Sequence, residues 1–221
     1  MRFRFLLVVA ATLVFAQPYA GLGVFENQTD VGNPDLKGSA AYDAATKEYK
    51  LSGSGVNMWA KSDQFHFLWK KLSGNVRLTA TLHFVGTSPT AHRKAGLMLR
   101  KTLDAGSPYV DAVVHGVGLT ELQDRETPDD ITRGFAFPVE GPQRIALEKR
   151  GNVYSMWYGN PGEPLKEGGW IQVNLGNDLY AGLFICSHDP KLMESAVFSD
   201  VTIEPLPATP RPAGKKGGRK K

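Results

Sequence analysis

Cysteine is nearly absent from this chain, and the absence constrains how the chain is held together. Cys186 is the single cysteine among 221 residues, so no disulfide can form within the chain. A fold without disulfides must rest on its hydrophobic core, which a chain of this length can supply. Cys186 follows the apolar run Leu183-Phe184-Ile185, which favours a buried thiol acting as a small apolar side chain over a nucleophile.

Several motifs that mark cofactor chemistry are also missing. The sequence contains no glycine-rich phosphate loop of the P-loop or dinucleotide type and no EF-hand pattern. The five histidines show no paired ligand spacing, and one cysteine cannot build a structural zinc site. The residues therefore predict neither a resident metal nor an organic cofactor.

Acidic residues are absent from the last stretch of the chain, residues 205–221, where six basic residues gather. Removing these six, and the Arg2 and Arg4 that precede an apolar run, leaves 18 of the 26 basic residues against 22 acidic ones. The body is thus mildly acidic, at about −4, and nucleic acid is not expected as a partner. The basic segment is rich in proline and glycine, which predicts a disordered tail. It either binds an anionic surface, such as lipid headgroups or cell-wall polymers, or is simply solvated.

The beginning of the chain has the pattern of a secretory signal peptide. Two arginines precede the apolar run Phe5–Ala16, and small residues follow it. Cleavage is predicted after Ala16 or Ala20, so residues 1–20 are assigned to the signal peptide. The alternative is an uncleaved anchor, but the run is shorter than the roughly 20 apolar residues that span a bilayer. The sequence thus predicts an exported protein, periplasmic or extracellular, with no transmembrane segment after cleavage.

The body between residues 21 and 204 lacks sustained helical periodicity, and only Lys191–Glu194 is assigned one helical turn. Short alternating segments separated by glycine, proline and asparagine indicate strands instead. This pattern predicts one all-β domain, a two-sheet antiparallel jelly-roll sandwich. The expected strands are Ala40–Tyr42, Glu48–Leu51, Phe65–Lys70, Asn75–Val85, Gly96–Leu103, Tyr109–His115, Leu119–Glu126, Thr132–Phe137, Arg144–Arg150, Val153–Tyr158, Tyr180–Cys186 and Ala196–Ile203.

The richest polar patterning lies in Ala95–Glu126, which reads as three antiparallel strands. A Gly116-Val117-Gly118 loop would pair His115 with Leu119 and Tyr109 with Arg125. Alternate side chains of a strand point to opposite faces, so this register predicts one buried face and one wet face. The buried set is Leu97, Leu99, Val110, Ala112, Val114, Thr120 and Leu122, and the wet set is Arg100, Tyr109, Asp111, His115, Glu121, Gln123 and Arg125.

Five residues of the wet set form the lead candidate for a ligand-binding surface. Their side chains supply the donors and acceptors that fix sugar hydroxyls, and the basic groups also suit an acidic sugar such as a uronic acid. The alternative is a cross-strand network of ion pairs, each contributing only about 0.2–1 kcal/mol. The five residues are Arg100, Asp111, His115, Gln123 and Arg125.

Two further residues outside that stretch are candidate ligand contacts. Trp59 is one of two tryptophans expected to be exposed, with Trp170, and an exposed indole ring can stack on a sugar. His188 lies in a Ser187-His188-Asp189 loop after a strong strand, and binding groups are often carried by such loops. The alternative for Asp189 is a local cap of the loop backbone. Ser187, His188 and Asp189 are adjacent in sequence and cannot form a catalytic triad.

Several segments together resemble the concanavalin A-like (LamG/glucanase-type) jelly roll. They are WAKSDQF at 59–65, AGLMLR at 95–100, the 109–126 hairpin and AGLFICSHDPKLMESAVF at 181–198. The chain is especially similar to the bacterial domain of unknown function related to "regulation of enolase protein 1". The resemblance implies a twisted sandwich whose concave face or rim binds carbohydrate in many members. It also implies that Ca²⁺ could be held in aspartate-containing loops, at Asp104 or Asp129-Asp130.

The glucanase branch carries alternating acidic residues on one strand, and this sequence has no such run. Asp111 and Glu121 come from different strands. The sequence therefore favours a binding module for an oligo- or polysaccharide over an enzyme. A glycoside-active hydrolase or lyase using Asp111, Glu121 or His115 is the first alternative. A structural module of the cell envelope, tethered by the basic tail, is the second.

Overall fold

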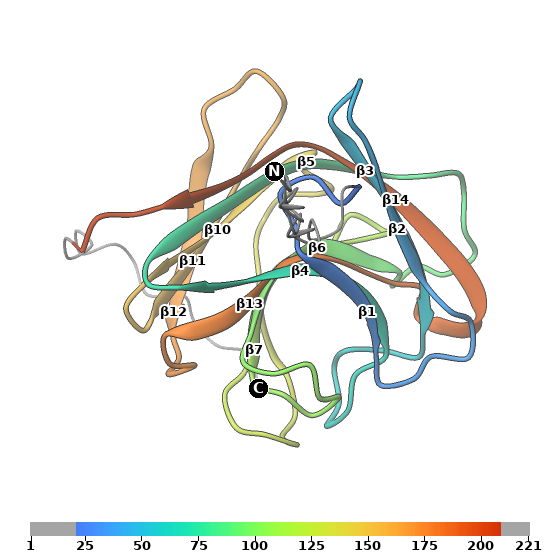
Figure 1. Cartoon of the computed structure of the whole chain (residues 1–221), viewed down its shortest axis with the longest axis horizontal. Coiled ribbons are helices and arrows are strands. Elements are labelled where there is room, and N and C mark those ends of the chain that lie inside the picture. The colour runs from blue at the N-terminus through green and yellow to red at the C-terminus, as the bar shows by residue number, and fades with distance from the viewer. Residues whose placement is uncertain (1–20, 209–221) are drawn as a thin grey trace, which may run out of the picture.

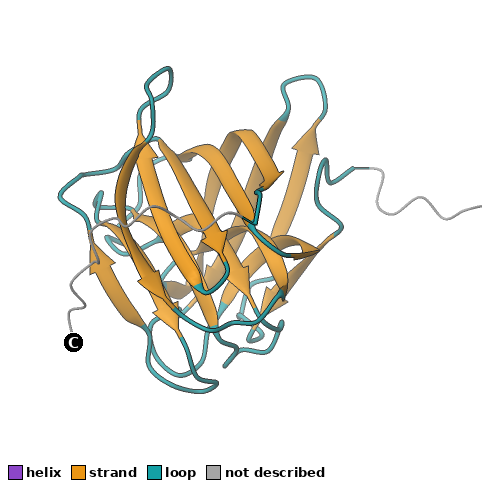
Figure 2. Cartoon of the chain, turned by 90° about the vertical axis from the view of Figure 1, so that its left-hand side faces the viewer, coloured by secondary structure: helices purple, strands orange, loops and turns teal. Residues whose placement is uncertain are grey.

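The structure is a computed structural model that describes residues 21–208. The predicted signal peptide, residues 1–20, and residues 209–221 of the predicted tail lie outside the described part. Within the described residues the chain forms fourteen strands and no helix. Figures 1 and 2 show the curved strands stacked in two layers, with loops at both ends of the layers.

Sheet A contains seven antiparallel strands in the order β1-β4-β13-β6-β7-β8-β9. Its central strands β6, β7 and β8 correspond to the Ala95–Glu126 stretch. The bounds in this sheet are β1 Asn27–Val31, β4 Phe65–Ser73, β6 Lys94–Arg100, β7 Tyr109–His115, β8 Thr120–Arg125, β9 Arg133–Ala136 and β13 Asp178–Cys186.

Sheet B also contains seven antiparallel strands, in the order β12-β11-β10-β5-β14-β3-β2. The predicted hairpin at Gly151-Asn152 is confirmed, because Arg150 pairs with Val153 across it. The bounds here are β2 Ser39–Asp43, β3 Glu48–Gly55, β5 Val76–Phe84, β10 Arg144–Arg150, β11 Val153–Gly159, β12 Lys166–Gln172 and β14 Asp189–Pro205.

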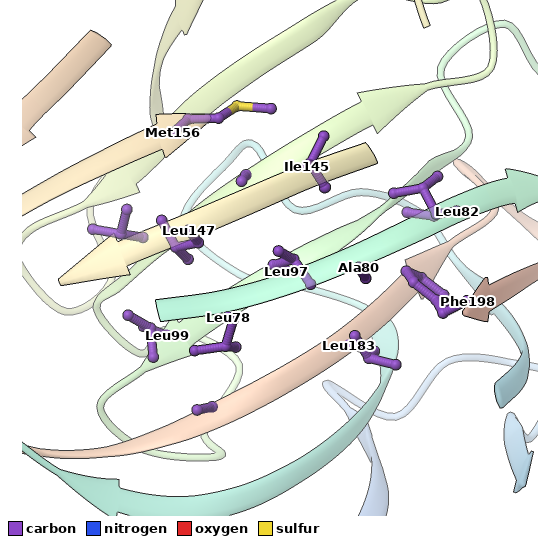
Figure 3. Packing of buried hydrophobic residues seen from close by; sticks show 14 of the residues in the cluster. Leu78, Ala80, Leu82, Leu97, Leu99, Ile145, Leu147, Met156, Leu183 and Phe198 are labelled. Atoms are coloured by element: carbon purple, nitrogen blue, oxygen red, sulfur yellow. The ribbon is translucent and has the colours of Figure 1, made fainter. Parts of the chain in front are cut away.

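The hydrophobic core lies between the two sheets. Leu78, Ala80 and Leu82 of β5 point toward Leu97 and Leu99 of β6, as Figure 3 shows, and all five are buried. The seven residues predicted to form the buried face of β6–β8 are all buried. Alternation along the strands therefore explains the inner face of both sheets.

Three parts of the strand prediction are corrected. Strand β1, with the sequence NQTDV, and strand β12, with KEGGWIQ, were not predicted, because polar residues and glycines hide the strand pattern. The glycines of β12 have a packing reason: a Cβ on Gly168 would lie 2.7 Å from the Phe137 ring. Lys191–Glu194 is not a helical turn but part of β14, which pairs with β3 across a register shift.

The last described residues remain attached to the body. Strand β14 ends at Pro205, and the amide of Leu206 then donates to the Asn75 carbonyl at 3.0 Å. Pro207 accepts a hydrogen bond from the Asn75 side chain. The first residues assigned to the tail, 205–208, thus run along the sandwich. None of residues 21–208 belongs to a helix that could cross a membrane.

Candidate functional site: the polar face of sheet A

The outward side of β6, β7 and β8 carries the polar residues that the sequence placed together, and we call it the polar face. The predicted register is confirmed. Tyr109 pairs with Arg125 and Asp111 with Gln123, while the His115 amide donates to the Leu119 carbonyl at 2.8 Å. Every member of the predicted polar set therefore shares one side of the sheet.

The prediction that this face is wet is wrong over most of its area. Arg100, Asp111, Gln123 and Arg125 are fully buried, and His115 is 5% exposed. Part of the cover is the loop between β3 and β4, residues 56–64. Its Met58 side chain is buried in a second apolar cluster that includes Phe65, Met98 and Tyr109. Hydrophobic contact thus holds this loop against the outward side of sheet A.

One end of the polar face is closed by a buried ion triad, and we call it the sealed end. Arg100 Nη1 and Arg125 Nη1 each donate to Asp63 Oδ2 at 2.7 Å. Arg125 Nη2 donates to Asp63 Oδ1 at 2.6 Å, so this pair is bidentate. The three side chains have an exposed fraction of 0%. Charge-assisted bidentate pairs are among the stronger hydrogen bonds in proteins.

Asp63 balances one of the two arginine charges at the sealed end, and backbone carbonyls and an aromatic ring stabilise the other. Arg125 Nε donates to the Asp130 carbonyl at 2.8 Å, and its Nη1 donates to the Ser107 carbonyl at 3.2 Å. Both guanidinium groups lie over the Tyr109 ring, at 5.6 Å for Arg100 and 5.1 Å for Arg125. Burial lowers the pKa of Arg125, but the hydrogen bonds and charge of Asp63 outweigh it and raise that pKa overall. In Arg100 burial prevails, and the pKa is lowered.

The other end of the polar face is accessible, and we call it the open end; it comprises Trp59, His92, His115, Glu121 and His188. Glu121 Oε2 accepts a hydrogen bond from the Gln123 amide at 2.6 Å and lies 3.4 Å from His115 Nε2. Burial raises the pKa of Glu121, but the interactions with His115 and Gln123 outweigh it and lower that pKa. Burial lowers the pKa of His115. At neutral pH these directions favour an ionised Glu121 beside a neutral His115.

Trp59 lies at the rim of the open end, next to Glu121. The side chain is 41% exposed, as the sequence predicted. A Cβ built on Gly134 of β9 would lie 3.0 Å from Glu121 Oε1 and 3.1 Å from Trp59 Cη2. The indole ring and the carboxylate therefore meet over this glycine, which has no side chain to separate them. Trp170, the other tryptophan predicted to be exposed, is half-buried on β12 of sheet B.

Asp111 and Lys94 lie deeper in the polar face. Neither carboxylate oxygen of Asp111 has a hydrogen-bond partner among the described residues. Burial raises the pKa of Asp111 well above its ordinary value, against the effect of the nearby Lys94 charge. Lys94 Nζ donates to Asn57 Oδ1 of loop 56–64 at 2.6 Å. Burial lowers the pKa of Lys94.

Two more histidines join His115 at the open end. His92 Nδ1 lies 3.4 Å from His115 Nδ1, and the rings of His92 and His188 are 5.6 Å apart. His188 has a φ of 62°, which is uncommon for a residue other than glycine and is found at functional sites more often than elsewhere. Asp189 accepts a hydrogen bond from the Lys191 amide at 2.8 Å, the local cap that the sequence allowed.

The structure brings Asp111, His115, Gln123, His188 and Trp59 to one face, although their contact with a ligand stays a prediction. Arg100 and Arg125 lie on the same face but are bonded to Asp63, so direct contact with a ligand would require opening the buried triad. The sequence reasoning missed the roles of Asp63, Lys94 and His92. Glu121 of the open end was predicted as a site residue only in the enzyme alternative. Within residues 21–208, no three metal-ligating side chains converge on one point.

The thiol of Cys186 lies on the same outward side of sheet A, next to Lys94 in the pairing of β13 with β6. It is buried, as the sequence predicted. Burial raises its pKa to about 11, so the thiolate needed for nucleophilic chemistry is disfavoured.

Comparisons with known proteins give structural likenesses. No family model matches the chain, and no curated protein matches it either. A functionally unknown protein from Saccharomyces cerevisiae is similar at a TM-score of 0.58 and 14% identity, over 81% of this chain and 96% of that one. A prokaryotic β-1,3-1,4-glucanase (lichenase) derived from a mouse hindgut metagenome is similar at a TM-score of 0.50 and 8% identity, over 84% and 97% of the two chains.

Likeness at these identities establishes the fold. The chain is an all-β, two-sheet jelly-roll sandwich of the concanavalin A-like type, as the sequence predicted. The same architecture serves unrelated functions, so function has to be argued from the polar face itself.

Proposed function

We propose that this chain is an exported saccharide-binding jelly-roll protein whose ligand contacts the open end of the polar face. Trp59 supplies a ring for stacking, Glu121 accepts hydrogen bonds from sugar hydroxyls, and His115 and His188 line the same end. The sugar rings of an oligo- or polysaccharide offer both the apolar faces and the hydroxyls that such a site needs. The glucanase of similar fold acts on a β-1,3-1,4-glucan, which makes this polymer the first ligand to test.

The exposed Trp59 beside the Glu121 carboxylate is the observation that carries the proposal. Large aromatic side chains on a sandwich normally fill the core, and an indole ring left 41% exposed loses that benefit. The backbone that carries the ring is held, because the Trp59 carbonyl accepts a hydrogen bond from the Thr132 amide at 2.9 Å. An aromatic ring on a held backbone, next to an ionised acceptor, suits a ligand with an apolar face and a polar edge.

A glycan array followed by calorimetric titration tests this proposal. Trp59→Ala should weaken the strongest-binding oligosaccharide by at least ~10-fold, which is about 1.4 kcal/mol. Trp170→Ala, a change of the same chemistry at a half-buried site on sheet B, is the control and should leave affinity unchanged. Equal affinity of wild type and Trp59→Ala would overturn the proposal.

A glycoside-active enzyme is the second candidate, and the two carboxyl groups favour it. The pKa of Asp111 is raised well above its ordinary value by burial, whereas the pKa of Glu121 is lowered. Two acids whose environments separate their pKa values in this way can divide the roles of proton donor and base. Asp111 and Glu121 belong to neighbouring strands of one face, β7 and β8.

Reducing-end and unsaturated-product assays on the bound polysaccharide separate the two candidates. Turnover that is abolished by Asp111→Asn and by Glu121→Gln would assign the protein to the enzymes. Binding without turnover assigns it to the binding modules. The structural envelope module requires that neither activity is found while the basic tail, residues 205–221, retains the protein on anionic surfaces.

Three finer expectations belong to the proposal as well. Export to the periplasm or the cell exterior rests on the signal-peptide pattern of residues 1–20. The resemblance to the domain related to "regulation of enolase protein 1" rests on the sequence motifs, since no family model matches. Calcium at Asp104 or Asp129-Asp130 rests on the fold resemblance, and no described cluster of ligands supports it.

A further inference from the structure

Loop 56–64 reaches both ends of the polar face, and this double contact is the starting point. Its Asp63 forms the ion triad of the sealed end, whereas its Trp59 forms the rim of the open end. Its Asn57 accepts a hydrogen bond from Lys94, which pairs with His115 of the open end. One short segment thus contains the buried anchor and the exposed aromatic ring, four residues apart.

Loop 56–64 is anchored to sheet A by further hydrogen bonds besides those of Asp63 to the arginines. Beside the three bonds to the arginines, the Asp63 amide donates to the Ala105 carbonyl at 3.0 Å. The Tyr109 hydroxyl donates to the Met58 carbonyl at 2.5 Å, and Arg125 Nη2 donates to the Ala60 carbonyl. The backbone on both sides of Trp59 is therefore held by side chains of β7 and β8.

We infer that Asp63 is a positioning residue, which fixes loop 56–64 so that Trp59 is held in its binding orientation before the ligand arrives. The inference rests on the proposed saccharide site. Asp63 itself is fully buried, so the role assigned to it is to support the loop and not to contact the ligand. Its role is to let the two arginines of the sheet fix the loop, so that binding does not have to order Trp59.

A double-mutant cycle tests the inference, with Asp63→Asn and Trp59→Ala made singly and together. The probes are hexasaccharides of β-1,3-1,4-glucan and of oligogalacturonate, and the one that binds more tightly is used for the cycle. Asp63→Asn should lower affinity about 3- to 10-fold when Trp59 is present. It should change affinity less than about 2-fold in the Trp59→Ala background, because there is then no ring left to position.

Hydrogen exchange of residues 56–64 supplies the structural readout. Exchange at the Asp63 and Gln64 amides, which donate to Ala105 and Asn57, should accelerate at least ~10-fold in Asp63→Asn. Asp200→Asn is the matched control: it is an exposed aspartate of sheet B whose side chain accepts one hydrogen bond from Thr81. It should change neither the exchange of the loop nor the affinity.

Tyr109→Phe repeats the cycle should Asp63→Asn fail to fold, since it removes only the hydroxyl, which donates to the Met58 carbonyl and lies 2.9 Å from the Thr132 hydroxyl. It should weaken binding in the same Trp59-dependent way. Equal losses of affinity in both backgrounds, or none in either, would overturn the positioning role while the proposed site stands. Failure of Trp59→Ala to weaken either hexasaccharide would instead remove the proposed site, and the inference with it.

Discussion

The two ends of the polar face lie on the same side of sheet A and share strands β7 and β8, yet they differ in what their charged side chains contact. At the sealed end, Arg100 and Arg125 share one buried carboxylate and several carbonyl groups, and no part of their side chains reaches the surface. At the open end, Glu121 retains 13% side-chain exposure and lies beside Trp59. Polar residues on a sheet face are thus held in the structure where a loop supplies a buried partner, and stay accessible to a ligand where it does not.

This contrast assigns different tasks to the two ends. A buried carboxylate between two guanidinium groups is a fixed element, because separating it from either partner would leave a desolvated charge. A carboxylate with one amide donor and a neutral histidine retains acceptor capacity for a ligand. The sealed end therefore supports loop 56–64, and the open end is the part of the face that we propose to bind saccharide.

The largest effect is expected from breaking the sealed end with Arg125→Ala. The variant removes both bonds to Asp63 and the bonds to surrounding carbonyls, and it should lower the unfolding free energy by about 3–5 kcal/mol. Arg133→Ala on β9 is the control, since its ion pairs with Glu126 and Asp130 are exposed and 3.9 and 3.8 Å long. It should cost less than about 1 kcal/mol in the same urea titration. Similar losses in both variants would contradict the contrast.

A smaller effect, confined to binding, is expected from Gly134→Ala. The added methyl group would crowd Glu121 and Trp59 at 3.0 and 3.1 Å, so the ring or the carboxylate must shift by a few tenths of an ångström. Affinity for the bound oligosaccharide should fall about 3- to 10-fold, or roughly 0.7–1.4 kcal/mol, by calorimetry. Gly159→Ala on β11, whose added methyl group would be at an ordinary 3.4 Å, should bind like the wild type.

Part of the pH dependence of stability should come from His115 at the open end. Burial holds the pKa of His115 below 6.5 in the folded chain, so the unfolded chain binds this proton more readily. The contribution of His115 to stability is therefore complete above about pH 6.5 and declines as the pH falls through that value. Unfolding titrations between pH 7.5 and 5 should show a smaller decline for His115→Gln than for the wild type. Parallel curves would show that His115 is not held neutral.

The smallest effect on stability is expected from His92→Ala. His92 is exposed, and its ring contacts the buried His115 and the half-buried His188, with ring centroids 5.6 Å apart in each pair. Truncation should change the unfolding free energy by no more than about 0.5 kcal/mol, measured beside Arg125→Ala. A loss as large as that of Arg125→Ala would mean that the open end is also a structural cluster.

The sequence was sufficient for the sandwich and for the side of the sheet that each residue of β6–β8 occupies. Alternation and a glycine loop determine those features locally, so the pairing of Tyr109 with Arg125 followed directly. The burial of the polar face could not be predicted in the same way, because loop 56–64, which covers part of it, is distant in sequence. Asp63 is 37 residues from Arg100 and 62 from Arg125, and no local pattern reports such a contact.

One indication of this contact was present in the sequence. Arg100 ends the apolar strand sequence AGLMLR, and an arginine in such a strand requires an acidic partner if the face is covered. Asp63, in the WAKSDQF segment that carried the family resemblance, was that partner. Strand β1 was missed for a different reason, since its sequence NQTDV has only one apolar residue and its extension depends on pairing with β4.

Backbone and indole NMR shifts during titration with the bound oligosaccharide test the division of the polar face most directly. The largest shifts are expected at the Trp59 indole and at the amides of Glu121 and Gly134. The side-chain signals of Arg100 and Arg125 should stay in place, because their bonds to Asp63 are kept in the complex. Shifts that centre on the two arginines, or on sheet B, would contradict the assignment of a supporting sealed end and a binding open end.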